Sequence, residues 1–392
     1  GGEIGDDIRW DLGVYEAGLR SDLIHRFSKR LQWVNGVDFG LQSFVTSSQF
    51  PTLGTFERTF PGSGFAEEPG LRQTNEDDTG AGLGFHSTMR SKLGHLTLIP
   101  GLRFDSYLWT GQSRLSMEPR LQVRLALAKK ERHVLKASGG KYSQLPRPID
   151  LSESIGNPEL ALKGAWQYGV GYAYRPDPFF HGDLTFFYKN MFHLIGGNPD
   201  YQTGSTEPRL LNNGYGRAYG LELMLRHRPS PRPIYGWIAY TLSRSERLDS
   251  GDKDEGWVLF EQDQTHILSS VLGYKWGQGW SFGVSTRWVT GTPQTPREAA
   301  RFDVDERRYR PVRGDRRSDR RPSFFQTDIR FEKKSAKKRN AFTWYVDVMN
   351  VTNRQNIEFF IYQYDQRAYS GIAGVPFFPS FGFEWSWSDP VF

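Results

Sequence analysis

Segment 291–321 is the part of the sequence richest in side chains that could bind a ligand, because it contains ten arginines. A guanidinium group binds a carboxylate or a phosphate through two parallel hydrogen bonds. The segment therefore predicts a site for an anionic ligand. The residues expected to form it are Arg307, Arg308, Arg310, Arg313, Arg316 and Arg317. Acidic residues are interspersed among them, so a solvated loop of mixed charge is the alternative interpretation.

A second group of charged residues is distributed over segments in which apolar and polar residues alternate. Within each segment these residues share one face, because the side chains of a β-strand alternate with a period of two. The members are Glu222, Arg226, Arg287, Asp328, Arg330 and Asp347. We expect them to line an enclosed aqueous space and to form salt bridges there, with one another or with a plug segment. Contact with a substrate is the alternative.

Other kinds of chemistry find little support in the sequence. No nucleophile, base and orienting group occur together, so we predict no catalytic residue and no enzymatic activity. The chain has no Cys, and its His residues show no recurring ligand spacing, so we predict no metal site and no cofactor. Asp249, Asp252, Asp254 and Glu255 could offer oxygens to Ca²⁺. Their spacing does not match a calcium-binding loop, which favours simple solvent exposure.

The composition favours one large β-structure. The 392 residues are 15% aromatic and include 42 Gly and 22 Pro, which favours strands and turns over long helices. No stretch approaches the ~18 consecutive apolar residues of a membrane-spanning helix. Much of the net charge of +6 lies in the arginine-rich segment, and no module of stacking aromatic residues accompanies it. We therefore expect no nucleic-acid partner.

Rows of bulky residues alternate with small or polar ones along most of the chain. Between positions 164 and 175, for example, aromatic residues and one valine occupy every second position. A membrane barrel places such rows against lipid and polar residues inside, whereas a soluble barrel would have to fit them into a narrow core. The pattern predicts an all-β transmembrane antiparallel barrel, with a large soluble all-β protein as the alternative. The residues expected to face lipid include Trp166, Tyr168, Tyr172, Phe186, Phe282, Trp344, Phe383 and Trp385.

The connections between the predicted strands alternate between short and long. Compact turns are predicted near 129–132, 176–178, 229–233, 277–279 and 333–338, and long connections near 143–163, 195–215, 246–263 and 291–320. Outer-membrane barrels have short periplasmic turns and long outer loops. The arginine-rich segment would then lie at the cell surface, where lipopolysaccharide phosphates are a further candidate ligand. Trp257, Tyr309 and Phe360 could stack on carbohydrate there.

Five short motifs resemble elements of the barrel domain of TonB-dependent outer-membrane receptors, in the order in which that family has them. They are Asn157-Pro158-Glu159-Leu160 followed by Lys163, Asn212 to Glu222, Asp263-Gln264-Thr265-His266, Asp347 to Arg354, and Val375 to Gly382. The first lacks the second Pro and the Glu of the family's pattern. Together the motifs cover roughly residues 140–388.

The resemblance implies an outer-membrane location and a transport function. In this family a plug closes a barrel of about 22 strands, and TonB acts through the plug to drive ligand import. We expect such a transporter for a siderophore, vitamin, sugar or peptide in a Gram-negative bacterium. The implied partners are membrane lipid, lipopolysaccharide, a plug, TonB through the plug, and other outer-membrane or periplasmic proteins. The alternatives are a structural or interaction role in a larger outer-membrane assembly, or a passive or export channel.

Strand counting predicts that residues 1–392 form a single but incomplete barrel domain. About fifteen strands fit the alternation, which leaves about seven of the family's 22 unaccounted for. With an odd number of antiparallel strands, the first and the last strand both start at the outer end. We expect the remaining strands and the plug to belong to an upstream segment or to a separate polypeptide. The sequence does not predict which ligand is carried.

Overall fold

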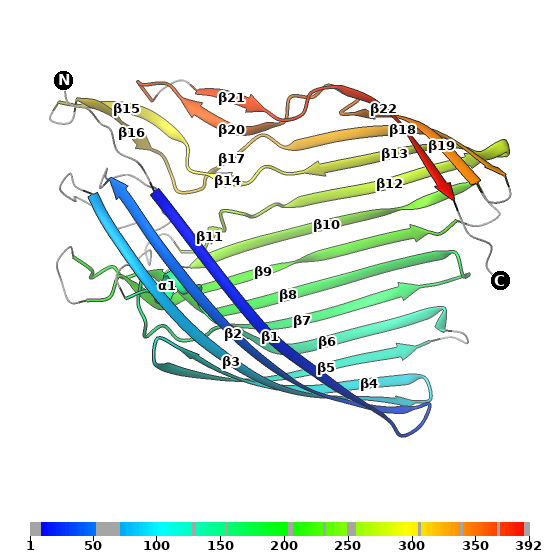
Figure 1. Cartoon of the computed structure of the whole chain (residues 1–392), viewed down its shortest axis with the longest axis horizontal. Coiled ribbons are helices and arrows are strands. Elements are labelled where there is room, and N and C mark those ends of the chain that lie inside the picture. The colour runs from blue at the N-terminus through cyan, green and yellow to red at the C-terminus, as the bar shows by residue number, and fades with distance from the viewer. Residues whose placement is uncertain are drawn as a thin grey trace.

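The structure, a computed structural model, describes residues 9–51, 71–127, 131–153, 156–202, 207–229, 233–248, 256–304, 307–337, 340–366 and 369–387. Most of them belong to one 16-stranded antiparallel sheet. The sheet curls, so that its first three strands pass in front of the middle strands (Figure 1). No helix in the described ranges is long and apolar enough to cross a membrane.

Strand order in the sheet follows the order of the chain. The path comprises β1 (Arg9–Arg26), β2 (Leu31–Pro51), β3 (Leu71–Leu93), β4 (Leu96–Trp109), β5 (Gln112–Ala126), β6 (His133–Gln144), β7 (Lys163–Tyr174), β8 (Phe180–Gly197), β9 (Leu210–His227), β10 (Ile234–Leu248), β12 (His266–Trp276), β13 (Trp280–Val289), β18 (Phe324–Lys337), β19 (Asn340–Met349) and β22 (Phe378–Trp387). The short β11 (Val258–Leu259) pairs with the C-terminal end of β10. The fifteen strands of the path confirm the predicted number.

Three of the predicted strands are shorter than the strands in the structure. We expected strands near 8–20, 29–43 and 83–93, whereas β1 continues to Arg26, β2 to Pro51, and β3 begins at Leu71. The added part of β2 includes Thr46, Ser47 and Ser48, which carry no apolar period. Backbone hydrogen bonds hold this part of the sheet together without that period.

The two ends of the sheet differ in the way predicted. The connections at one end are short, as at 27–30, 94–95, 175–179 and 277–279 (η3, Gly277–Gly279). At the other end they are long, as at 145–162, 198–209, 290–323 and 350–377. The exception is the hairpin between β4 and β5, which turns at Thr110 and Gly111 with φ of 47° and 73°. Both β1 and β22 start at the long-loop end (Figure 1).

Segment 290–323 is more ordered than the loop that the sequence predicted. It contains two small sheets, in which β14 (Pro293–Gln294) pairs with β17 (Asp319–Arg320) and β15 (Arg297–Asp303) pairs with β16 (Arg308–Arg313). A third hairpin, β20 (Ile357–Tyr362) with β21 (Tyr369–Ala373), lies in the last long connection. Charged residues dominate β15 and β16, so no apolar alternation signalled these strands.

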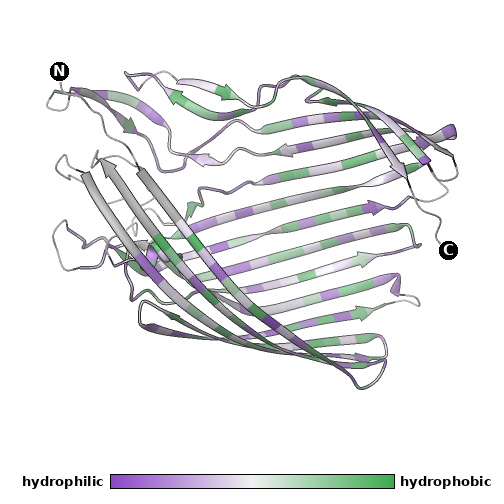
Figure 2. Cartoon of the chain, viewed as in Figure 1, coloured by the Kyte–Doolittle hydropathy of each residue, from purple (hydrophilic) through white to green (hydrophobic). Residues whose placement is uncertain are grey.

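The strand register places the bulky rows on one face of the sheet. Tyr168 lies opposite Tyr188, and Tyr188 lies opposite Tyr219. Farther along the sheet, Phe282 lies opposite Phe331 on this same face. All the residues predicted to face lipid are on it, and all but the half-buried Trp344 are exposed. Figure 2 shows the resulting alternation of apolar and polar residues along the strands.

The opposite face is concave and carries the largest apolar cluster. Phe44 of β2 and Leu210 of β9 belong to this one cluster, although seven strand spacings separate β2 from β9. The other members are Trp109 of β4, Ile195 of β8, and Leu151 and Leu160 of connection 145–162, so the cluster spans this separation through several residues. The connection contains the single-turn helix α1 (Pro148–Leu151). This connection therefore folds over the concave face at the long-loop end.

Candidate functional site

Asparagines of two of the sequence motifs hold the long loops to the ends of the strands. The Asn157 amide donates to the carbonyl of Leu210 at 2.8 Å. The Asn350 amide donates to the carbonyls of Arg354 and Val375, both at 2.9 Å, and Asn350 is fully buried. These side chains replace the strand pairing that ends there, so their role in the described structure is to fix the loops.

Connection 145–162 is held at the rim by a buried arginine of β5. Arg114 donates through Nε to the carbonyl of Leu160 at 2.6 Å and through Nη2 to the carbonyl of Pro158. Within the same connection, Arg147 donates to both carboxylate oxygens of Asp150, at 2.9 and 2.8 Å. The hydrogen bonds from Arg147 to this carboxylate raise the pKa of the Arg147 guanidinium.

The long loops surround a cavity of about 1310 Å³. It lies between connection 249–265, connection 290–323 and the β20 hairpin. Its charged residues are Arg244, Arg297, Arg313, Arg316, Arg317 and Arg321 against Glu261, Asp315 and Glu358. Six cations against three anions leave an excess of three positive charges. The aromatic residues Trp257, Phe359, Phe360 and Tyr362 also line it. The cavity thus combines cationic groups with apolar surface.

Some arginines of the cavity fasten the loops to one another, and others can offer hydrogen-bond donors to a ligand. Arg317 is 8% exposed and donates to the carbonyl of Leu259 at 2.7 Å, so it fastens one loop to another. The Arg297 guanidinium lies 3.4 Å from the centre of the Tyr362 ring and also donates to Gln366. A guanidinium that stacks on an aromatic ring uses its face for that contact. Its N–H groups point outward in the plane of the guanidinium, where a ligand can accept hydrogen bonds from them.

The six arginines predicted as an anion site do not all lie at one site. Arg313, Arg316 and Arg317 line the cavity. Arg310 instead pairs with Asp303 at 2.8 Å on the β15–β16 hairpin. Arg307 contributes its backbone carbonyl, which accepts a hydrogen bond from the Tyr364 hydroxyl at 2.7 Å. The side chain of Arg308 lies outside the described residues.

Several cavity residues come from loops that the sequence analysis did not connect with the arginine-rich segment. Arg244 and Glu358 line the cavity from β10 and β20. Of the three predicted stacking residues, Trp257 and Phe360 line it, whereas Tyr309 packs against Phe302 at 5.1 Å. The four acidic candidates for Ca²⁺, at 249–255, lie outside the described residues. Among the residues that are described, no cluster of metal-binding side chains occurs.

The charged residues predicted to line an enclosed space all lie on the concave face. Arg330 donates to Asp347 at 3.0 Å and to Glu332 at 3.1 Å, and its guanidinium lies 3.8 Å from the centre of the Tyr345 ring. Asp328 accepts a hydrogen bond from the backbone of Asn350 at 2.8 Å. Arg330 and Asp347 therefore form the predicted ion pair, whereas Asp328 binds the backbone of the residue that follows β19.

The other members of the set are more separated. Arg287 lies over the Phe324 ring at 5.7 Å. Glu222 and Arg226 share the concave face through the register of β9 with β10. Neither forms an ion pair with any residue in the described ranges.

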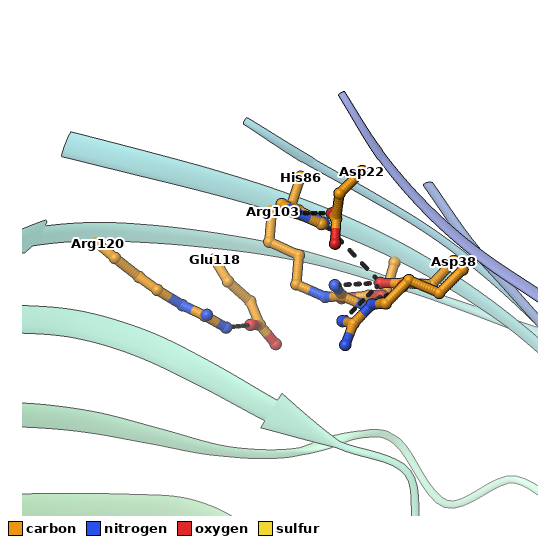
Figure 3. Close-up of polar contacts among 8 residues, drawn as sticks. Asp22, Asp38, His86, Arg103, Glu118 and Arg120 are labelled. Atoms are coloured by element: carbon orange, nitrogen blue, oxygen red, sulfur yellow. Dashed lines mark hydrogen bonds and ion pairs between the residues drawn. The ribbon is translucent and has the colours of Figure 1, made fainter. Parts of the chain in front are cut away.

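A second charge network on the concave face was missed by the sequence analysis (Figure 3). Asp38 accepts hydrogen bonds from Arg20 at 2.5 Å and from Arg103 at 2.6 Å. Arg103 also pairs with Asp105 at 2.6 Å, and His86 lies 3.1 Å from Asp22. These residues come from β1, β2, β3 and β4, so the network joins four neighbouring strands.

Glycines on the same face make room for this second network. A Cβ atom at Gly36 would lie 2.1 Å from the His86 ring, and one at Gly84 would lie 2.5 Å from Arg103 Nη2. Gly36 and Gly84 are therefore the positions at which charged side chains from adjacent strands cross. The sequence does contain a signal for this network. Glycines and charged residues alternate with a period of two, which places them on one face of the same strands.

The comparisons with known proteins decide the family. Residues 3–351 match the family model described as TonB-dependent receptor-like, β-barrel. The chain belongs to this family. It is accordingly a part of an outer-membrane receptor barrel. Barrels of this kind carry an outward-facing apolar band. No functionally curated protein matches the sequence.

Solved TonB-dependent receptors share the fold at low sequence identity. The FrpB iron transporter from Neisseria meningitidis (F3-3 variant) superposes with a TM-score of 0.65 and 17% identity over 95% of this chain and 55% of FrpB. The ferric citrate transporter FecA, in its unliganded form, gives 0.64 and 17% over 96% and 55%. FpvA from P. aeruginosa, bound to a heterologous pyoverdine, gives 0.66 and 16% over 96% and 48%. The chain thus spans about half the length of these receptors.

The family assignment fixes which end of the barrel is which. In outer-membrane barrels the long loops face outward, so the cavity lies at the cell surface. At the periplasmic end of the convex face, Trp276, Trp280, Phe331 and Trp344 pack together, with Trp280 and Phe331 centroids 5.0 Å apart. Lys333 Nζ lies 4.5 Å from the Trp280 ring centre. Aromatic rings with lysines are typical of the membrane–water interface.

Proposed function

We propose that this chain supplies the outer mouth and much of the wall of a receptor that imports an anionic ligand through a plugged barrel, driven by TonB. The observation that carries the proposal is the surface cavity of about 1310 Å³, with three excess positive charges and four aromatic residues. FrpB is an iron transporter and FecA a ferric citrate transporter. An anionic iron chelate would suit a cavity of this charge.

The cavity offers separate contacts for the charged and the apolar parts of such a ligand. Arg297, held on Tyr362, and Arg316 from the neighbouring turn provide donors for carboxylate oxygens. Phe359 and Phe360 provide surface for apolar or ring atoms. Glu358 and Asp315 disfavour cationic compounds and so contribute to selectivity.

The proposal is tested by ligand binding and uptake in cells that produce the complete receptor. Ferric citrate and a ferric pyoverdine, labelled with radioactive iron, serve as probes. The double variant Arg297→Ala/Arg316→Ala should bind the accepted probe at least about a hundredfold more weakly, because two charged hydrogen bonds are lost and each is worth about 1.5–3 kcal/mol. Arg310→Ala is the matched control, because Arg310 pairs with Asp303 outside the cavity.

Uptake and binding should respond differently to the loss of energy coupling. In cells that lack TonB, surface binding should persist while accumulation of the probe stops. Uptake that continues without TonB would show a passive channel and contradict the proposed mechanism. Equal loss of binding in the Arg310 control and in the cavity variant would contradict the proposed site.

A further inference from the structure

A second hollow, of about 330 Å³, lies in the concave wall of the barrel between β5 and β8. The strand register arranges the residues of this wall in three rows. The rows are Arg120–Gly140–Gln167–Lys189, Gln122–Ser138–Gly169–Phe187 and Arg124–Lys136–Gly171–Thr185. Glycines occur only on the middle strands of these rows, β6 and β7, whereas three of the four basic residues lie on β5 and β8. The hollow is built from strands, and it shares no lining residue with the surface cavity.

The floor of the hollow depends on the missing side chains of its glycines. A Cβ atom at Gly171 would lie 2.8 Å from both Thr185 Oγ1 and the carbonyl of Leu184. One at Gly169 would lie 3.0 Å from Ser138 Oγ, a hydroxyl that can rotate away. The floor thus exposes backbone and small polar groups, and Gln167 adds an amide.

The basic residues around the hollow are not all neutralised. Lys136 Nζ lies 2.6 Å from both oxygens of Asp183, and Arg120 pairs with Glu118. Arg124 and Lys189 form no ion pair with any described residue, and Lys189 only approaches the Phe187 ring, at 5.7 Å. Two positive charges, on the exposed Arg124 and the half-buried Lys189, are therefore left without a carboxylate among the described residues. They lie on a concave polar wall, which attracts a counter-ion more strongly than a flat surface does.

We propose that this hollow is a second anion-binding site, within the barrel wall, for a small solute that carries carboxylate or phosphate groups. Arg124 on β5 and Lys189 on β8 approach it from opposite sides. Three strand spacings, about 14 Å, and four residues along the strands, about 13 Å, separate the two backbone positions, so the cations lie diagonally across the hollow. Both long side chains must extend toward its centre to contact one solute with two anionic groups. The amide of Gln167 and the hydroxyls of Ser138 and Thr185 provide further hydrogen bonds between them.

The test measures binding of simple anions to the purified full chain in detergent micelles. Calorimetric titrations use citrate as the carboxylate probe and pyrophosphate as the phosphate probe. The protein carries Arg297→Ala/Arg316→Ala, so that the surface cavity does not contribute. In this background we expect one binding site, and the further change Arg124→Ala/Lys189→Ala should weaken it by about tenfold or more. Arg124→Lys/Lys189→Arg should retain binding, because the charges remain.

Two further variants separate a built site from general attraction to a positive wall. Arg226→Ala removes an unpaired cation of the same face on β9 and should leave the affinity unchanged. Gly169→Val fills the hollow without changing a charge and should abolish binding. The proposal is overturned if the background protein binds neither probe, or if Arg226→Ala weakens binding as much as the hollow variants. Since the surface cavity is removed throughout, these outcomes do not depend on the proposed import function.

Discussion

At the scale of single residues, the face on which a side chain lies could be predicted, but its partners could not. Arg330 and Asp347 were assigned to one polar face from their alternation, and the structure joins them at 3.0 Å. Odd and even positions of a strand lie on opposite faces of the sheet, whichever strand is its neighbour. The sequence alone therefore assigns the face of a side chain. Arg103 and Asp38 pair at 2.6 Å across 65 positions of sequence. That contact required the register of β2 with β3 and β4, which composition does not contain.

Replacement of Gly84 tests whether the glycines of β3 are required by the second charge network. In Gly84→Ala the new methyl group meets Arg103 Nη2 and Asp105 Oδ1, at 2.5 and 2.6 Å before any shift. We expect a loss of about 1–3 kcal/mol in the free energy of unfolding, because the buried Asp105 pair must move. Thermal unfolding in micelles, followed by tryptophan fluorescence, measures it.

Gly82→Ala is the matched control for this substitution. It lies on the same strand and face, and its new methyl group would meet Tyr107 at an ordinary 3.5 Å. The control should unfold like the unsubstituted protein. Equal destabilisation of both variants would mean that any Cβ weakens β3, and that the network plays no special part.

At the scale of elements, strands with an apolar period were predictable and the structured loops were not. The sequence placed all fifteen strands of the path, yet it missed β15 and β16. Residues such as Arg301 and Arg310 face each other there without an apolar side to reveal the strand. For the same reason the cavity at the outer mouth could be predicted only in part. Its residues come from three connections whose packing is set by tertiary contacts.

The pairing of β5 with β6 shows how side chains replace a strand ladder. The ladder extends from Ala126 to Arg120 and ends at Pro119, which has no N–H group to donate. Beyond that point the Glu118 carboxylate accepts a hydrogen bond from the backbone of Ser143 at 2.7 Å. Arg114 then binds two carbonyls of connection 145–162. The polar side chains of β5 thus hold connection 145–162 at the end of the sheet where the β5–β6 ladder stops.

Substitution of Arg114 tests the role of this residue in holding the connection. Arg114→Ala leaves the carbonyls of Leu160, which is buried, and of Pro158, which is partly exposed, without their donor. The unsatisfied Leu160 carbonyl alone costs about 1–3 kcal/mol. We expect limited proteolysis to cleave connection 145–162 at least about tenfold faster, while the strands remain protected. Arg124→Ala, on the same strand and face, should not change the cleavage rate. Unchanged cleavage in Arg114→Ala would show that the apolar cluster around Leu151 suffices.

At the scale of the whole molecule, the odd number of strands on the path has a topological consequence. β1 and β22 both start at the outer end, so direct pairing between them would be parallel. Closure by antiparallel pairing requires an odd number of further strands. The receptors of this family have about 22 strands, which would supply seven. We propose that those strands come from a segment upstream of the fifteen strands in the same polypeptide, or from a separate polypeptide.

The account depends most on the claim that the convex face meets hydrocarbon while the concave face meets water. The chain contains no Cys, so single cysteines can carry spin labels without background. Labels at Tyr168 and Phe282 test the convex face, and labels at Gln167 and Arg287 test the concave face of the same strands. In bilayers we predict that the first pair collides mainly with oxygen and the second mainly with a water-soluble nickel complex. The reverse pattern, or equal accessibility of neighbouring positions, would contradict the account.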